Sequence, residues 1–197
     1  HVRSRRQRQM CIRDRTMGAS SKDKGNAWEL EVAKFLEEHF EGKFSRVPRS
    51  GAMFGGENAE NAEGERQDVV EILTGDIITP KDFPFTIEAK HYEDFKFSHL
   101  LQGENKLLDG WIESSEKDAD LAKRLPMIMA KFSYIGSYVV FDYKIIKTDT
   151  GICPSTYFKN HLIYKRKWMM ISFEEFVNVK NIIVDFAKLK LKSDSNG

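Results

Sequence analysis

The chain has 197 residues, of which 41% are hydrophobic, and its 31 basic and 30 acidic side chains give a formal net charge of +1. This length and composition suit a single domain with a sizeable core. No apolar run approaches the roughly 18–20 residues that a membrane-spanning helix needs, and no signal-peptide pattern is present, which argues against a membrane or secreted protein.

The first sixteen residues differ from the rest and contain six arginines and one aspartate. Residues 5–15 resemble the translation of a transposase adapter used in sequencing libraries, so we expect residues 1–16 to be a non-native leader and Met17 to be the native start. The other interpretations are a basic nucleic-acid-binding arm and a short targeting segment. Without the leader, 25 basic and 29 acidic residues give a net charge of −4. Only Cys153 then remains, so no intrachain disulfide can form and we expect a reducing, cytoplasmic setting.

Helical spacing of apolar residues predicts a first helix over residues 26–40. Residues 43–49 are expected to form a short strand. Residues 55–67 are rich in Gly, Asn, Ala and Glu and lack apolar anchors, which is typical of an exposed loop.

Two further strands are predicted, one within residues 69–79 and one over residues 83–91. A long helical region follows over residues 98–124, with a break expected near Gly110 and an end before Pro126.

Strands are then expected over residues 127–132, 138–143 and 161–171. Ser172 is expected to cap a further helix, because Glu175 three residues later completes the pattern of a capping box. Residues 189–197 are polar, and we expect the end of the chain to be frayed.

The order of elements over residues 26–143 is helix, three strands, helix and strand. This mixed order predicts an α/β fold in which a mixed sheet is flanked by helices. We expect residues 17–197 to form one domain, with its core at residues 24–143 and a C-terminal extension at residues 148–197.

Two carboxylates and a lysine come together on the strands predicted at the middle of the chain. Asp76 lies in the first of these strands, and Glu88 and Lys90 lie in the next. Because side chains alternate along a strand, Glu88 and Lys90 share one face, while Ile87 and Ala89 face the core. Two carboxylates can hold Mg²⁺ or Mn²⁺ against a phosphate, and the charge of Lys90 would favour a hydroxide or the charge that develops on phosphorus. The residues predict a metal-dependent nuclease.

The acid-x-Lys pattern is weak by itself, since it occurs five times in this chain. The alternative interpretation is a strand-edge ion pair between Glu88 and Lys90, with Asp76 in a turn. The apolar strand that carries Glu88, and the preceding strand that presents Asp76, favour the catalytic interpretation.

Residues 24–142 resemble the PD-(D/E)xK nuclease superfamily and, within it, the archaeal and phage-type Holliday junction resolvases. In that family an acid follows a glycine by four residues near the first helix, and here Glu29 follows Lys24-Gly25 in this way. The resemblance implies a restriction-endonuclease-like fold. It also implies that Glu29 is a further metal ligand or orients a metal-bound water. Without the resemblance, Glu29 reads as a first-turn glutamate that the helix dipole stabilises.

The resemblance also implies contacts with nucleic acid. Residues 47–51 resemble the family's Ser-Gly segment, in which Arg49 would pair with a phosphate and Ser50 would hydrogen-bond to one; a simple turn is the alternative. Gln102 matches the glutamine that the family often has on the helix after the lysine. Lys131, on the strand after the long helix, is a further candidate for a phosphate contact.

We therefore expect a Mg²⁺-dependent or Mn²⁺-dependent endonuclease that resolves branched DNA in recombination. Two symmetric cuts on a four-way junction imply a homodimer, and a phage source would place it in the host cytoplasm. The loop at residues 55–67 is longer than in the small resolvases, and Gly75 stands where the superfamily's name has proline. The alternatives are another repair or restriction-type endonuclease of the same fold, a DNA-binding module without turnover, and a structural protein.

Overall fold

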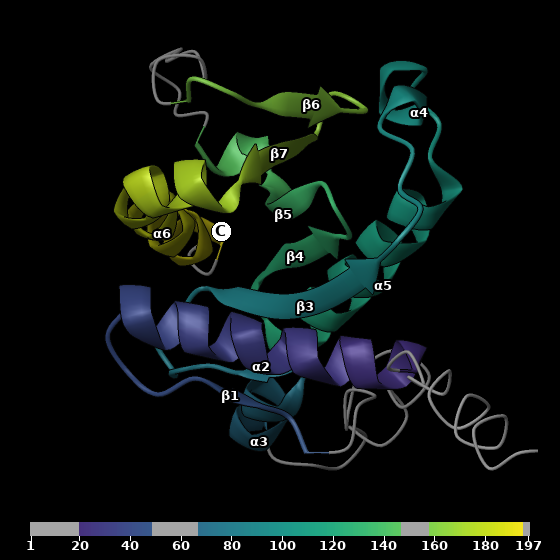
Figure 1. Cartoon of the computed structure of the whole chain (residues 1–197). Coiled ribbons are helices and arrows are strands. Elements are labelled where there is room, and N and C mark those ends of the chain that lie inside the picture. The colour runs from purple at the N-terminus through teal and green to yellow at the C-terminus, as the bar shows by residue number, and fades with distance from the viewer. Residues whose placement is uncertain (1–19, 49–66, 147–157, 195–197) are drawn as a thin grey trace, which may run out of the picture.

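The computed structural model describes residues 20–48, 67–146 and 158–194 (Figure 1). Its centre is a five-stranded sheet in the order β3-β4-β5-β7-β6. β3 and β4 are parallel, and the other neighbours are antiparallel. The expected α/β fold with a mixed sheet flanked by helices is confirmed. The strands are β3 (Phe85–Tyr92), β4 (Leu125–Phe132), β5 (Gly136–Asp142), β6 (Leu162–Tyr164) and β7 (Trp168–Ser172).

Helices cover both faces of this sheet (Figure 1). α2 (Ser21–His39) and α6 (Phe173–Asp194) pack on one face, and α5 (Lys106–Ala122) packs on the other, next to the short α4 (Ser98–Leu101). Side chains alternate along each strand, so a strand contributes to the hydrophobic cores on both faces of the sheet. In β4, Met127 and Met129 lie in the core on the α2 side, while Ile128 and Ala130 lie in the core on the α5 side. Odd-numbered and even-numbered residues of a strand therefore lie on opposite faces of the sheet.

A second, two-stranded sheet lies at the outer edge of β3. It consists of β1 (Ser45–Arg46) and β2 (Ile77–Ile78), which pair antiparallel. The Asp76 amide N–H, just before β2, donates to the Ile87 carbonyl of β3 at 2.9 Å, and the Val47 amide donates to the Asp76 carbonyl at 3.0 Å. The backbone around Asp76 is thus hydrogen-bonded on both sides.

α2 begins earlier than the apolar spacing predicts, because Ser20 and Asp23 form a capping box at its N-terminus. The Trp28 indole N–H donates to the Met129 carbonyl at 2.8 Å in the buried interior. This hydrogen bond and the apolar stripe of α2 fix the helix on the face of the sheet. The apolar members of the stripe are Trp28, Val32, Ala33 and Leu36.

Two predicted elements between residues 67 and 124 differ from the structure. The strand predicted within residues 69–79 is present but short, since only Ile77–Ile78 (β2) is strand, and the residues before it belong to helix α3 (Gln67–Leu73). Its branched residues favour a strand locally, but Val70 is buried and α3 contacts α5. The long helical region is interrupted after Gln102, where Gly103 has φ +75°, and Gly110 lies inside α5.

The strand predicted over residues 161–171 is a hairpin of β6 and β7. Lys165 and Arg166 have φ values of 48° and 55° and reverse the chain between them. The cap predicted at Ser172 is confirmed, since the Glu175 amide donates to the Ser172 hydroxyl at 3.1 Å. β7 and α6 extend the same sheet and the same core as β3–β5. In the described ranges, no helix is both long and apolar enough to cross a bilayer.

Candidate active site

Asp76 is attached to the outer edge of β3 at two points. Its amide donates to the Ile87 carbonyl at 2.9 Å, and its Oδ2 accepts a hydrogen bond from the Ala89 amide at 2.8 Å. Both β3 groups flank Glu88 in the sequence, so the carboxylate of Asp76 is held beside the Glu-x-Lys segment. The position is set by backbone hydrogen bonds and does not depend on a flexible side chain.

Gly75 makes this close approach possible. Its φ is +87°, which L side chains rarely adopt, and a Cβ added here would lie 2.8 Å from the Ile87 carbonyl oxygen and 2.8 Å from Cγ2 of Thr86. A residue with a side chain would push Asp76 away from β3. The close packing against β3 therefore explains why a glycine precedes Asp76 in this fold.

Glu88 and Lys90 share the α5-facing side of β3, as the alternation predicts. Their side chains form an ion pair, with Glu88 buried and Lys90 partly buried. Ile87 and Ala89 face the opposite core beside α2. The ion pair of the alternative interpretation is therefore present, but it lies beside the partly buried carboxyl of Asp76 instead of on an open strand edge.

The carboxyl of Asp76 sits in an unfavourable environment for its charge. Its pKa is raised to about 8, chiefly by burial and then by the charge of Glu88, with a smaller increase from Glu29, while Lys90 and the Ala89 amide act in the opposite direction. Crowded carboxyls of this kind are what a divalent cation would neutralise. The donor set at Asp76 and Glu88 therefore fits a hard cation such as Mg²⁺.

Lys90 stays a cation in this site. Burial lowers its pKa, but the carboxylates of Glu88, Asp76 and Asp118 outweigh that effect, and the net shift is upward from its ordinary value. A lysine with a raised pKa cannot take a proton from water near neutral pH. Its contribution to chemistry is the positive charge and the hydrogens that it can donate.

Glu29 does not complete a three-carboxylate cluster with Asp76 and Glu88. Among the described residues, no three acids, histidines or cysteines are close enough together to hold one ion. Glu29 is buried on α2 and accepts a hydrogen bond from Nε of Arg46, whose Nη2 donates to Oδ1 of Asn26 at 2.6 Å. Its effect on Asp76 shows that it lies nearby, which suits an orienting role better than direct ligation.

Two residues near the site were not anticipated. Arg46, from β1, partners Glu29 and carries no signal in the sequence that separates it from other arginines. Asp118 is a buried acid on α5 that acts on Lys90. The sequence does indicate that Asp118 is buried, because it lies three residues after Ser115 and six after Ile112 on the buried stripe of α5.

Of the four residues predicted to contact nucleic acid, the structure describes Gln102 and Lys131. Arg49 and Ser50 lie outside the described residues. Gln102 is exposed at the end of α4. Lys131 pairs with His91 in register and lies on the α2 face, where its Nζ is 2.6 Å from Glu31 and 5.1 Å from the centre of the Trp28 ring. It is thus on the opposite face from Glu88 and Lys90.

An acid at the start of β2, a Glu-x-Lys pair on β3 and a flanking helix with an acid define the PD-(D/E)xK nuclease arrangement. Residues 20–185 match the model of the family described as Phage putative PDDEXK endonuclease. The chain belongs to this family, and it is a nuclease of the PD-(D/E)xK superfamily, a class that acts on DNA. Searches of curated proteins and of solved structures each found no match to it.

Proposed function

We propose that the protein is a Mg²⁺-dependent endodeoxyribonuclease, able to use Mn²⁺, whose preferred substrate is a four-way DNA junction. The observation that carries the metal-dependent chemistry is the convergence of Asp76, Glu88 and Lys90 at the edge of β3. The preference for a junction rests on the likeness of residues 24–142 to the junction resolvases.

Each side chain has a role that follows from its environment. Asp76 and Glu88 would hold the metal ion, which when bound supplies a more acidic water and neutralises phosphate charge. Lys90, protonated and beside Glu88, holds a water by hydrogen bonding and stabilises the negative charge that builds up on the phosphate. Glu29, held by Arg46, orients solvent near Asp76. Arg49 and Ser50 remain predicted phosphate contacts.

Symmetric resolution of a junction requires two active sites, so the proposal includes a homodimer. One protomer alone would nick one strand at a time. We expect the protein to elute as a dimer in size-exclusion chromatography coupled to light scattering, and to cut the two opposing strands of a junction at matched positions.

The test compares a labelled four-way junction with a linear duplex of matched sequence, each with Mg²⁺ or with EDTA. Glu88→Ala should lower the cleavage rate by at least about a hundredfold, since it removes a group that holds the metal beside the phosphate. Glu113→Ala is the matched control, because Glu113 is an exposed glutamate on α5 whose side chain is 70% accessible.

The outcomes separate the candidate functions. Paired, metal-dependent nicks on the junction that Glu88→Ala abolishes support the full proposal. Equal cleavage of both DNAs supports the nuclease and refutes the junction preference. A folded protein that binds DNA, but cuts neither substrate with Mg²⁺ or Mn²⁺, refutes the nuclease proposal in favour of a DNA-binding module.

A further inference from the structure

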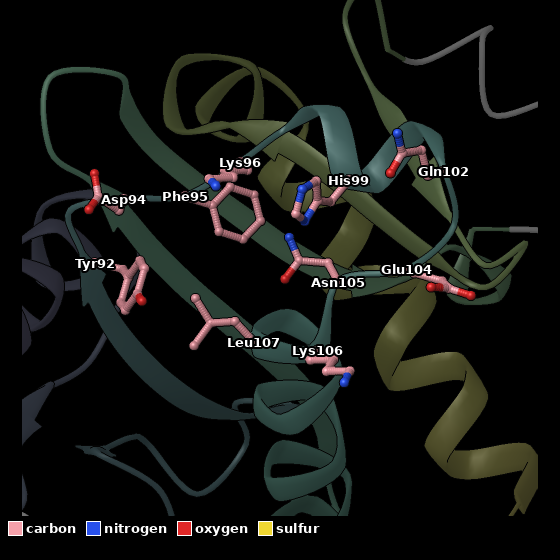
Figure 2. A pocket seen from close by; sticks show the side chains of 10 residues that line it. All are labelled: Tyr92, Asp94, Phe95, Lys96, His99, Gln102, Glu104, Asn105, Lys106 and Leu107. Atoms are coloured by element: carbon pink, nitrogen blue, oxygen red, sulfur yellow. The ribbon is translucent and has the colours of Figure 1, made fainter.

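A cavity of about 460 Å³ opens between the end of β3 and the start of α5 (Figure 2). This volume lies in the range that suits small organic ligands, about 300–1,000 Å³. Tyr92, one of the residues that line it, follows Lys90 by two positions and therefore shares the α5-facing side of β3 with Glu88 and Lys90. The cavity thus begins roughly 7 Å further along the strand than the catalytic lysine.

One side of the cavity is apolar and has fixed geometry. Tyr92 is 39% exposed and packs edge-to-face on Trp111, with ring centres 6.1 Å apart. Phe95 is buried and stacks on Phe132, with ring centres 4.1 Å apart. Leu107, on the first turn of α5, extends toward the side of the cavity where Tyr92 lies (Figure 2). A flat, partly exposed aromatic surface held in this way can stack on another planar ring.

Asn105 places a side-chain amide donor in the lining of the cavity. Only 6% of this residue is exposed, its Oδ1 accepts from the Leu108 amide at 3.1 Å, and its own amide donates to the Tyr164 hydroxyl at 2.8 Å. The Nδ2 group is directed toward His99 (Figure 2), and no described residue accepts a hydrogen bond from it. This donor faces the accessible space of the cavity, where a ligand could provide an acceptor for it.

The charges around the cavity cancel. Lys96 and Lys106 are balanced by Asp94 and Glu104, which lie at opposite ends of the lining (Figure 2). No ion pair or side-chain hydrogen bond joins either lysine to another described residue, so both stay available at the rim. The interior therefore favours a neutral, planar group with acceptor atoms, and the rim can accommodate the phosphates attached to it.

We propose that this cavity binds one unpaired nucleobase of the substrate DNA strand, next to the phosphate that is cut. The base stacks on Tyr92 and accepts a hydrogen bond from Nδ2 of Asn105, while Lys96 or Lys106 contacts the adjacent backbone. Exposed Gln102 reaches the same cavity from α4 and provides a further polar contact. This assignment rests on the proposed nuclease function and specifies how the strand is held there.

Asn105→Asp tests the Nδ2 hydrogen-bond donor of Asn105 separately from the helix cap. Aspartate caps a helix as well as asparagine, so the carboxylate still accepts from the Leu108 amide, and its charge is favourable at the N-terminus of α5. Nδ2 is lost and an acceptor takes its place. The matched control is Asn178→Asp, the same change at an exposed position of α6, which packs on the opposite face of the sheet.

The measurement is the binding of forked DNA in EDTA by fluorescence anisotropy, with one abasic site moved through successive positions near the branch. The wild type should lose roughly tenfold to a hundredfold in affinity at one position, the amount expected for a lost base–aromatic stack. Asn105→Asp should bind intact DNA more weakly by a similar factor and lose little more at that same position. Asn178→Asp should behave as the wild type does.

Three results would overturn the inference. If the wild type binds and cuts DNA but no abasic position matters more than the others, the cavity holds no base while the nuclease function stands. If free dTMP binds in saturation-transfer NMR and Asn105→Asp abolishes that binding without any effect on DNA, the cavity serves a free nucleotide. If folded protein neither binds nor cuts DNA, the proposed function fails and the cavity assignment fails with it.

Discussion

At the scale of single residues, the backbone at Gly75 decides where Asp76 lies. The glycine has a positive φ, and backbone of β3 occupies the space that a Cβ would need. Gly75→Ala should therefore lower the free energy of unfolding by about 1–3 kcal/mol, since both strain and a clash with the Ile87 carbonyl result. Urea denaturation followed by circular dichroism measures this change.

Gly110 provides the control for that substitution. It lies inside α5, and nothing is within 4 Å of a Cβ added there. Gly110→Ala should increase the free energy of unfolding by about 0.5–1 kcal/mol, because alanine favours a helix. If the two alanine variants shift stability in the same direction, the steric account of Gly75 is wrong.

The raised pKa of Asp76 predicts a pH dependence for the metal-free protein. Its folded pKa of about 8 lies above the unfolded value near 4, so the folded state keeps a proton that the unfolded state loses. Stability should thus fall as pH rises from about 4 to 8. Asp76→Asn removes this loss, because an amide stays neutral and can still accept from the Ala89 amide.

Thermal melts in EDTA across this pH range test the prediction. The gain in melting temperature of Asp76→Asn over the wild type should be small near pH 4 and largest near pH 8. Asp185→Asn, an exposed position on α6, supplies the baseline for removing one carboxylate. A constant difference between Asp76→Asn and the wild type at every pH would contradict the assigned pKa.

The site residues differ in how well the sequence could predict them. Asp76, Glu88 and Lys90 could be placed because the alternation of one strand and a short connection between two strands are local features. The role of Arg46 could not be predicted, because its partner Glu29 lies on another element and only the folded chain brings the two residues together. The sequence could not predict the face on which Lys131 lies, because that depends on the register of β4 with β3.

At the scale of elements, local propensity failed where tertiary contacts decide. Branched residues in α3 favour a strand, yet packing against α5 makes them helical. The hairpin of β6 and β7 reads as one strand because its turn is made by Lys165 and Arg166 instead of glycine. The break predicted in the long helix at Gly110 is wrong. The helix is interrupted before Asn105, which caps α5, and Gly110 lies within α5.

Tyr164 connects β6 to the start of α5. Its hydroxyl accepts from the Asn105 amide at 2.8 Å and donates to Oδ1 of Asp109 at 3.0 Å. Tyr164→Phe leaves the buried Asn105 amide without its acceptor, so we expect a loss of about 1–3 kcal/mol in the free energy of unfolding. Chemical denaturation gives this value directly.

Tyr138→Phe is a suitable comparison for Tyr164→Phe. Tyr138 packs against the same core, and its hydroxyl has no hydrogen-bond partner among the described residues. We expect a change within about 0.5 kcal/mol. Equal losses in both variants would mean that the Tyr164 hydrogen bonds contribute nothing measurable to the connection.

At the scale of the whole molecule, the C-terminal part completes the sheet that carries the site. β7 pairs with β5, and α6 contributes Phe176, Ile183 and Ala187 to the core that α2 shares. A chain that ends at residue 146 would expose the edge of β5 and lose one side of this core. The resemblance to the resolvases extends only to residue 142, so a strand and a helix could be predicted in the part that follows, but not their place in the central sheet and core.

We expect the shortened chain, residues 17–146, to lack cooperative unfolding and the near-ultraviolet circular dichroism of a packed core. The chain of residues 17–197, prepared in parallel, is the reference. A truncated protein that melts cooperatively and still cuts DNA in a metal-dependent way would show that residues 147–197 form a dispensable addition.

Each of the two carboxylates that we propose as metal ligands already has one oxygen engaged. Oδ2 of Asp76 accepts from the Ala89 amide, and Oε1 of Glu88 pairs with Lys90. Each acid therefore has a single oxygen left to offer without competition. A large ion that prefers several bidentate carboxylates is poorly served by such a pair, whereas a small octahedral ion that keeps much of its water is well served. Because of these hydrogen bonds we expect the site to favour a small ion, so calcium should bind more weakly than magnesium and should not support turnover.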